Sequence, residues 1–194
     1  MTSSHAHAHH LPSLSPALRT LCDAMMGARD EPDAVPNALP AFRLTDPAAL
    51  LEDLPSALRT GRAESYTRHV IFSDPQGAFT LVYLIWRPGQ HSPVHGHRTW
   101  CGYRVLQGDL TETHYRWDDA SETAAVCGGK VRRAGDHIAA SPGLGHIHRL
   151  GNDSDEVCIS LHMYGVPREA ISTGVNLLVT VASPANRRSI SSRT

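Results

Sequence analysis

The spacing of apolar residues divides the chain near Gly61 into a helical part and a part made of strands. Before Gly61, apolar residues recur at steps of three and four, the spacing of one face of a helix. These residues are Leu14, Leu18, Leu21 and Met25. A second helical segment is predicted over residues 46–58, because it begins Asp-Pro, as many helices do. We expect these helices to cover one side of the core.

After Gly61 the chain consists of short runs rich in Val, Ile, Tyr and Thr, separated by turn sequences such as Asp-Pro-Gln-Gly, Arg-Pro-Gly-Gln and Cys-Gly-Gly. The pattern predicts about seven strands, at residues 66–72, 79–86, 102–106, 110–117, 137–140, 146–150 and 157–164. Their spacing favours an all-β sandwich or barrel. The longest apolar run, residues 81–86, is too short to cross a bilayer, so we expect no membrane protein.

The length of 194 residues suits a single core. We expect a disordered His-rich tail at residues 1–10, a helical region at 11–61, a β-barrel at 62–185 and a flexible tail at 186–194. Four histidines fall in the first ten residues, ahead of any periodic apolar pattern, and we assign no specific metal site to them.

The charge and the cysteine content limit the partners and the cell compartment that the sequence supports. Lys and Arg number 18 against 19 for Asp and Glu, which leaves no basic surface of the kind that holds nucleic acid. The four cysteines lie far apart, with no Cys-x-x-Cys pair and no secretory leader, which fits a reducing compartment without disulfides. We expect a cytoplasmic protein, a monomer or weak homo-oligomer, with no membrane or nucleic-acid partner.

The most unusual feature of the composition is 13 histidines beside only 3 phenylalanines. His95 and His97 lie two apart, so in a strand both point to one face and can share one ion. Five residues separate Gly89 from His95, three separate His97 from Cys101, and six separate Cys101 from Gly108. This spacing resembles the first cupin motif, with Cys101 at the position where the family usually has a ligand glutamate.

A second motif lies further along the chain. Gly145, two residues, His148, three residues and Asn152 resemble the second cupin motif, which selects His148 over His146 as the third ligand. We interpret the other histidines of this region as ordinary surface or core residues: His69, His91, His114, His137 and His146.

Three neutral imidazoles with no carboxylate would leave the charge of a bound dication uncompensated by protein, so an anionic substrate could supply the balance. Imidazole suits iron, zinc, copper and nickel alike, so the type of ligand does not name the metal.

Several segments between about residue 66 and residue 166 together point to one family. They are Tyr66-Thr67-Arg68, Trp86 placed nine residues before His95, Leu-Gln-Gly-Asp-Leu-Thr-Glu-Thr at 106–113, His-Arg-Leu-Gly-Asn at 148–152 and Ser-Leu-His-Met-Tyr at 160–164. Their combination resembles the cysteine dioxygenase family of thiol dioxygenases, in its bacterial form. The resemblance implies a cupin fold, a small jelly-roll β-barrel with the N-terminal helices packed on the outside.

The resemblance also implies a chemistry. One Fe(II) per chain would be held by His95, His97 and His148, and the substrates would be L-cysteine and O2. Both oxygen atoms would be placed on sulfur to give cysteine sulfinic acid, a step of cysteine catabolism. A thiolate is the soft anion that a neutral three-histidine site lacks, and ligation by the metal lowers the pKa of a thiol enough to generate it.

Arg68 is the candidate for substrate recognition, because a guanidinium pairs bidentately with a carboxylate and stays charged. Tyr66, two residues earlier, can add a hydroxyl donor, and Trp86 is expected to form a wall of the pocket. Relatives that prefer 3-mercaptopropionate resemble the chain elsewhere but tend to carry glutamine at this position. Arg68 therefore favours cysteine.

The resemblance implies a hydrogen-bond relay of Ser160, His162 and Tyr164 beside the iron, in which the Tyr164 hydroxyl orients substrate or oxygen. Cys101 is a further candidate, because mammalian members join a nearby cysteine to this tyrosine by a thioether. Cys101 lies four residues after His97, where the mammalian spacing is five, and Gly102 follows it. Period-two parity would place Cys101 on the face of the paired histidines, and we expect an uncrosslinked thiol close to Tyr164.

Three alternatives stay open on the sequence. The same chemistry could act on 3-mercaptopropionate or mercaptosuccinate. A zinc cupin could act as a hydrolase or lyase through metal-bound hydroxide. A non-enzymatic cupin could bind a small ligand.

Overall fold

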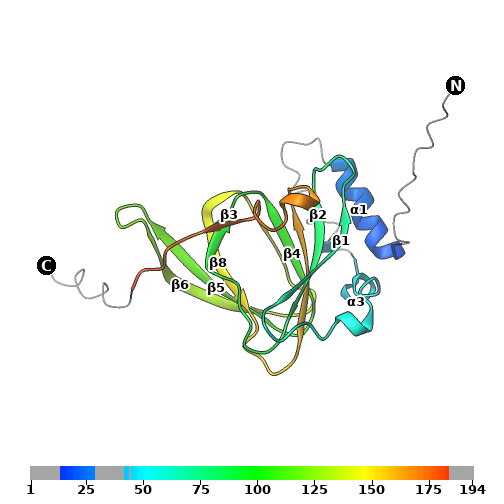
Figure 1. Cartoon of the computed structure of the whole chain (residues 1–194), viewed down its shortest axis with the longest axis horizontal. Helices are drawn as coiled ribbons and strands as arrows, with labels where there is room; N and C mark the ends of the chain where they lie inside the picture. The colour runs from blue at the N-terminus through cyan, green and yellow to red at the C-terminus, as the bar shows by residue number, and fades with distance from the viewer. Residues whose placement is uncertain (1–13, 29–41, 44, 184–194) are drawn as a thin grey trace, which may run out of the picture.

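The computed structural model describes residues 14–28, 42–43 and 45–183, and within them the chain is mainly β-structure (Figure 1). The tails predicted at residues 1–10 and 186–194 lie outside the described residues.

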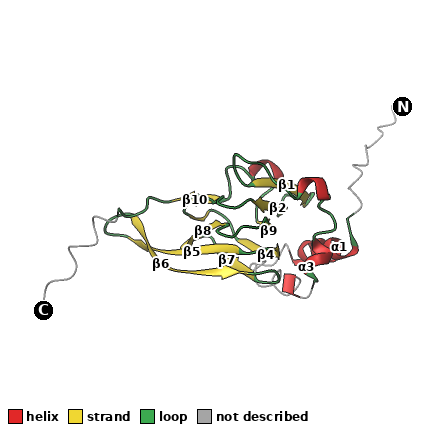
Figure 2. Ribbon diagram, turned by 90° about the horizontal axis from the view of Figure 1, so that it is seen from below, coloured by secondary structure: helices red, strands yellow, loops and turns green. Residues whose placement is uncertain are grey.

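Ten described strands form two five-stranded antiparallel sheets. The first sheet has the order β1 (Thr67–Ser73), β2 (Thr80–Trp86), β9 (Cys158–Tyr164), β4 (Cys101–Gln107) and β7 (His137–Ala140). The second has the order β10 (Asn176–Leu178), β3 (His95–His97), β8 (Gly143–Gly151), β5 (Leu110–Asp118) and β6 (Thr123–Arg132). The predicted fold class, an all-β cupin barrel with helices outside, is confirmed (Figures 1 and 2).

The helices lie at one end of the molecule, against the outer face of the first sheet (Figure 1). α1 (Pro16–Ala28) buries the predicted apolar face, including Leu18, Leu21 and Met25. These side chains pack with alternate residues of the two central strands, β2 and β9: Leu81, Tyr83, Ile85, Ile159, Leu161 and Met163. No described helix is long and apolar enough to pass through a membrane.

The inward face of the same two strands lines the barrel. On β2 this face carries Val82, Leu84 and Trp86, which belong to a second buried cluster with Val105 of β4 and Leu110 of β5. Because helices cover one face of β2 and the opposite sheet covers the other, the apolar run at 81–86 has no polar alternation. The inward positions of β9 instead carry polar side chains, including Ser160 and His162.

The second predicted helical segment, residues 46–58, forms only two short turns. The start is as expected, because Asp46 caps α3 (Pro47–Leu50) by accepting a hydrogen bond from a backbone N–H of its first turn at 3.1 Å. The segment ends in the 3-10 turn η1 (Ser56–Leu58). Pro55 explains the break, since proline has no N–H to donate and forces the residue before it away from helical geometry.

The seven predicted strands are present, and three further strands, β3, β6 and β10, fall outside the predicted ranges, although His95 and His97 were expected to share one strand. β3 and β10 have three residues each, too few to show a pattern. The Cys-Gly-Gly sequence expected to form a turn lies inside β6. There Gly128 pairs with His114 and Val126 with Tyr115, so Cys127 is the extra residue of a β-bulge.

Candidate metal centre and substrate pocket

The three histidines predicted as ligands meet at one point inside the barrel. His95 and His97 lie on β3, and His148 is the cross-strand partner of His95 on β8. All three are buried, and one ring nitrogen from each lies within 4.8 Å of the others. Gly96 allows this approach of the two strands, because a Cβ there would lie 2.7 Å from the Gly143 carbonyl oxygen.

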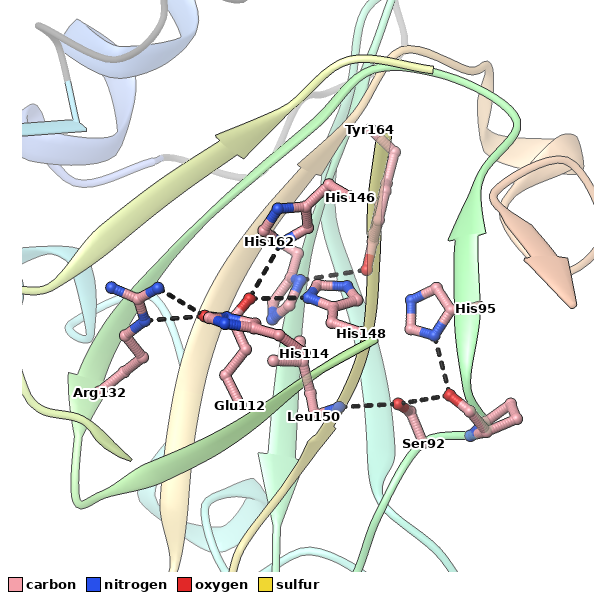
Figure 3. A network of polar contacts seen from close by, with 11 residues as sticks. Ser92, His95, Glu112, His114, Arg132, His146, His148, Leu150, His162 and Tyr164 are labelled. Carbon is pink, nitrogen blue, oxygen red and sulfur yellow. Dashed lines mark hydrogen bonds and ion pairs between the residues drawn. The ribbon is translucent and has the colours of Figure 1, made fainter. Parts of the chain in front are cut away.

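Hydrogen bonds at the far side of two rings leave Nε2 free to bind a metal. Nδ1 of His95 donates to the Pro93 carbonyl at 2.9 Å, and Nδ1 of His148 donates to Glu112 Oε1 at 2.8 Å (Figure 3). Both ring nitrogens of His97 are buried without a partner among the residues that the structure describes. A buried donor or acceptor without a partner is costly, and coordination of a metal would give one of the two nitrogens a partner. The residues therefore fit a bound cation.

The electrostatics also favour metal binding. Burial, reinforced by the neighbouring His148, lowers the pKa of His95 to about 4 and that of His97 to about 3. Burial lowers the pKa of His148 as well. Histidine binds a metal only as the neutral imidazole, so all three rings are ready to coordinate at neutral pH.

Glu112 of β5 is a site residue to which the sequence analysis gave no role. Its side chain is fully buried behind His148 and contacts Arg132 from β6 and His146 from β8 (Figure 3). No carboxylate was expected among the ligands, and Glu112 is not one of the three histidines that could hold the ion; it contacts the outer ring nitrogen of His148. The available signal was strand parity: Glu112 shares the inward face of β5 with buried Leu110.

Arg68, Tyr66 and Trp86 lie together, as the resemblance implied. The guanidinium of Arg68 donates from Nη2 to the Tyr66 hydroxyl at 2.9 Å. The Tyr66 ring stacks on Trp86, with 4.4 Å between ring centroids. Arg68 is exposed, and Trp86 is buried. Arg68 and Tyr66 thus place polar groups next to the aromatic ring of Trp86.

One cavity joins these residues to the histidines. It is lined by Tyr66, Arg68, Leu84, Trp86, Ser92, His95, Leu150, His162, Tyr164 and Asn176. Six of the predicted site residues face this space, and His97 and His148 complete the histidine group beside it. The cavity is small, about 20 Å³, and it is bordered both by Arg68 and by the ligand candidate His95.

Ser160, His162 and Tyr164 form the expected relay along the inward face of β9. Ser160 Oγ lies 2.8 Å from His162 Nε2, and His162 Nδ1 lies 3.1 Å from the Tyr164 hydroxyl. The indole N–H of Trp86 donates to Ser160 Oγ at 3.0 Å. With Trp86 donating to it, Ser160 can donate its own proton to Nε2, and in that tautomer of His162 the Nδ1–H donates to the Tyr164 oxygen.

Burial lowers the pKa of His162 well below its usual value and raises that of Tyr164. Both side chains are therefore uncharged at neutral pH. In the tautomer in which His162 donates to the Tyr164 oxygen, the O–H of Tyr164 can donate into the cavity.

Cys101 lies beside Tyr164, but not for the reason that the sequence suggested. The strand of the paired histidines ends at His97, and Cys101 begins β4 in the other sheet, so parity does not carry across residues 98–100. Cys101 is instead the direct cross-strand partner of Tyr164. Burial raises the pKa of the Cys101 thiol to about 12, which keeps it protonated.

Comparison with known proteins decides the family. A family model described as cysteine dioxygenase type I matches residues 61–173, more than half of the chain. The chain belongs to the cysteine dioxygenase type I family. The match contains the histidine group and the residues that line the cavity up to Tyr164.

Two curated relatives illustrate the distance within the cysteine dioxygenase family. Cysteine dioxygenase type 1 of Homo sapiens is 33% identical over 105 residues, 53% of this chain and 52% of that protein. The protein of the same name from Danio rerio is 32% identical over 112 residues, 56% of this chain and 55% of that protein. The match thus spans about half the length of these relatives.

Solved structures of low identity are also similar to the chain. Oxalate oxidase in complex with the substrate analogue glycolate has a TM-score of 0.45 at 16% identity, covering 59% of this chain and 58% of that one. An uncharacterized protein with a double-stranded β-helix domain from Klebsiella pneumoniae has a TM-score of 0.42 at 18% identity, covering 55% and 77%. At these TM-scores neither similarity bears on function.

Proposed function

We propose that this protein is a thiol dioxygenase whose preferred substrate is L-cysteine. The observation that carries the proposal is that Arg68, Tyr164 and His95 line one cavity, with His97 and His148 beside His95. Family membership supports an iron-dependent dioxygenase, and Fe(II), one per chain, is the cofactor we propose. The reaction adds O2 to cysteine and yields cysteine sulfinic acid, with both oxygen atoms on sulfur.

Bound Fe(II) would supply a coordination site for the substrate thiolate and for O2. The thiolate brings the negative charge that three neutral imidazoles do not. At the other end of the cavity, Arg68 and the Tyr66 hydroxyl would bind the substrate carboxylate, since a guanidinium matches it with two parallel hydrogen bonds. Two fixed ends would orient the sulfur toward the metal and away from bulk water.

Tyr164 would act on the reacting atoms through its hydroxyl. Because His162 donates to the Tyr164 oxygen, the tyrosine proton is directed into the cavity, where it can hydrogen-bond to substrate or to oxygen. Ser160 and Trp86 hold His162 in the tautomer that this requires. We propose positioning roles for Ser160, His162 and Trp86, and a catalytic role for Tyr164.

Oxygen consumption by the iron-loaded protein against a panel of thiols tests the proposal. We expect uptake with cysteine and much weaker uptake with cysteamine, which lacks a carboxylate. Faster uptake with 3-mercaptopropionate or mercaptosuccinate would keep the enzyme class and replace the substrate. No uptake with any thiol would contradict the proposal and favour a zinc cupin or a ligand-binding protein.

A further inference from the structure

The three histidines of the metal centre are held in three different ways. His95 donates its Nδ1 proton to a neutral backbone carbonyl, that of Pro93. His97 has no partner among the described residues. His148 alone donates to a carboxylate, that of Glu112. The ligands are therefore not equivalent, although their chemistry is the same.

Glu112 is fully buried, and its two oxygens have separate partners. Oε1 lies 2.8 Å from His148 Nδ1 and 3.1 Å from His146 Nε2. Oε2 lies 2.8 Å from Arg132 Nε and 2.7 Å from Arg132 Nη2, so the guanidinium binds it by two nitrogens, and His114 Nε2 lies 3.2 Å from the same oxygen. Figure 3 shows the carboxylate between the arginine and His148.

The charge state of this carboxylate follows from its partners. Its Oε2 pairs with two nitrogens of the Arg132 guanidinium, which stays positively charged, and this pair keeps the buried carboxylate in its anionic form. Because Arg132 holds Oε2 by two nitrogens, the carboxylate cannot rotate away from His148 without also breaking this buried ion pair.

A second metal site at Glu112, His114 and His146 is the competing interpretation, because these three side chains also gather closely enough to share an ion. Arg132 argues against it. Its guanidinium binds Oε2, the oxygen that His114 also contacts, and would keep a fixed positive charge beside any ion bound there. Both His114 and His146 are also partly exposed, unlike the three predicted ligands.

We propose that Glu112, fixed by Arg132, is a positioning residue that makes His148 the strongest of the three metal ligands. A carboxylate that accepts the outer N–H of a ligating imidazole fixes its tautomer and orientation and increases its basicity. Glu112 thereby supplies a negative charge one hydrogen bond away from the ligand His148. This inference rests on the metal centre of the proposed function, but not on the identity of the thiol.

Glu112→Gln tests the inference, because the amide keeps the size of the side chain and an oxygen acceptor for His148 but removes the charge. We expect the dissociation constant for Fe(II) to rise about 10–100-fold, the usual effect of losing such a partner. The Fe(III)/Fe(II) potential should shift to more positive values, since the oxidised ion loses more from the missing charge. Glu122→Gln, the same change at an exposed residue between β5 and β6, is the control and should alter neither quantity.

Folding and metal content keep the outcomes separate. If Glu112→Gln unfolds, Arg132→Lys provides the second variant. It keeps the positive charge but removes the hydrogen bonds from two nitrogens to Glu112, so it should also weaken iron binding. A folded Glu112→Gln protein with unchanged iron affinity and potential would overturn the inference. So would two ions per chain with one lost in the variant. Iron binding without thiol oxidation would contradict the proposed function while leaving this inference intact.

Discussion

Arg68 is the residue that connects the architecture of the cavity to the choice of substrate. It is exposed at the cavity mouth, it is held by the Tyr66 hydroxyl, and it lines the same space as His95. In the proposed function, this guanidinium pairs with the carboxylate of the substrate.

Arg68→Ala should reduce the transition-state stabilisation of cysteine by about 1.5–3 kcal/mol, the usual value of a hydrogen bond to a charged group. This corresponds to a loss of roughly 10- to 150-fold in kcat/KM. Cysteamine has no carboxylate, so its slow oxidation should not change. Steady-state oxygen uptake with both thiols measures the difference. Equal losses for cysteine and cysteamine would show that Arg68 supports the fold of the cavity rather than substrate recognition.

His148 and His146 lie two residues apart and both contact Glu112, so they provide a matched pair. His148→Ala should abolish stoichiometric iron binding, because a three-ligand site with one ligand lost holds its metal poorly. His146→Ala should retain the iron. Metal analysis after desalting is the measurement, and loss of iron only from His146→Ala would reverse the assignment.

At the scale of the elements, strands β4 and β9 determine the surroundings of Tyr164. Their register places Cys101 directly opposite this tyrosine, while Gly102 and Tyr103 follow on β4. Tyr103 in turn stacks on His162, with ring centroids 5.1 Å apart, so β4 supports the relay from one side.

We expect Cys101 to remain a free thiol after aerobic turnover, since its raised pKa disfavours the reactive thiolate. Intact-mass measurement before and after turnover with cysteine should show no loss of hydrogen from the chain. A peptide that joins Cys101 to Tyr164, and is missing from Cys101→Ser, would prove the opposite.

The same elements explain how far the sequence was informative. Period-two alternation correctly put His95 with His97, and Ser160 with His162, because each pair lies within one strand. The same rule failed for Cys101, because the chain changes sheets at residues 98–100. The local sequence at these residues does not indicate such a change of sheet. The contact of Glu112 with Arg132 could not be predicted from the sequence either, because it depends on how β5 pairs with β6.

At the scale of the whole molecule, the barrel keeps several neutral histidines away from water. His95 and His97 have depressed pKa values in the folded protein, near 4 and 3, whereas both take up protons below about pH 6.5 once the chain unfolds. Protons therefore bind preferentially to the unfolded state between these limits, and stability must fall as the pH falls.

The free energy of unfolding of the metal-free protein should decrease from pH 6.5 toward pH 4 by up to about 1.4 kcal/mol per pH unit for each of these histidines. Urea denaturation at several pH values measures the slope. A folded double variant, His95→Gln with His97→Gln, should show a shallower dependence. Identical slopes in the two proteins would mean that these histidines are not held neutral by the fold.

The central claim is that the barrel adds both atoms of O2 to the sulfur of a thiol bound between the histidine group and Arg68. Turnover of cysteine by the iron-loaded protein under isotopically labelled oxygen, followed by mass spectrometry of the product, tests this most directly. The account predicts cysteine sulfinic acid with both added oxygen atoms labelled and one O2 consumed per cysteine. Unlabelled oxygen in the product, or a disulfide in place of the sulfinic acid, would contradict it.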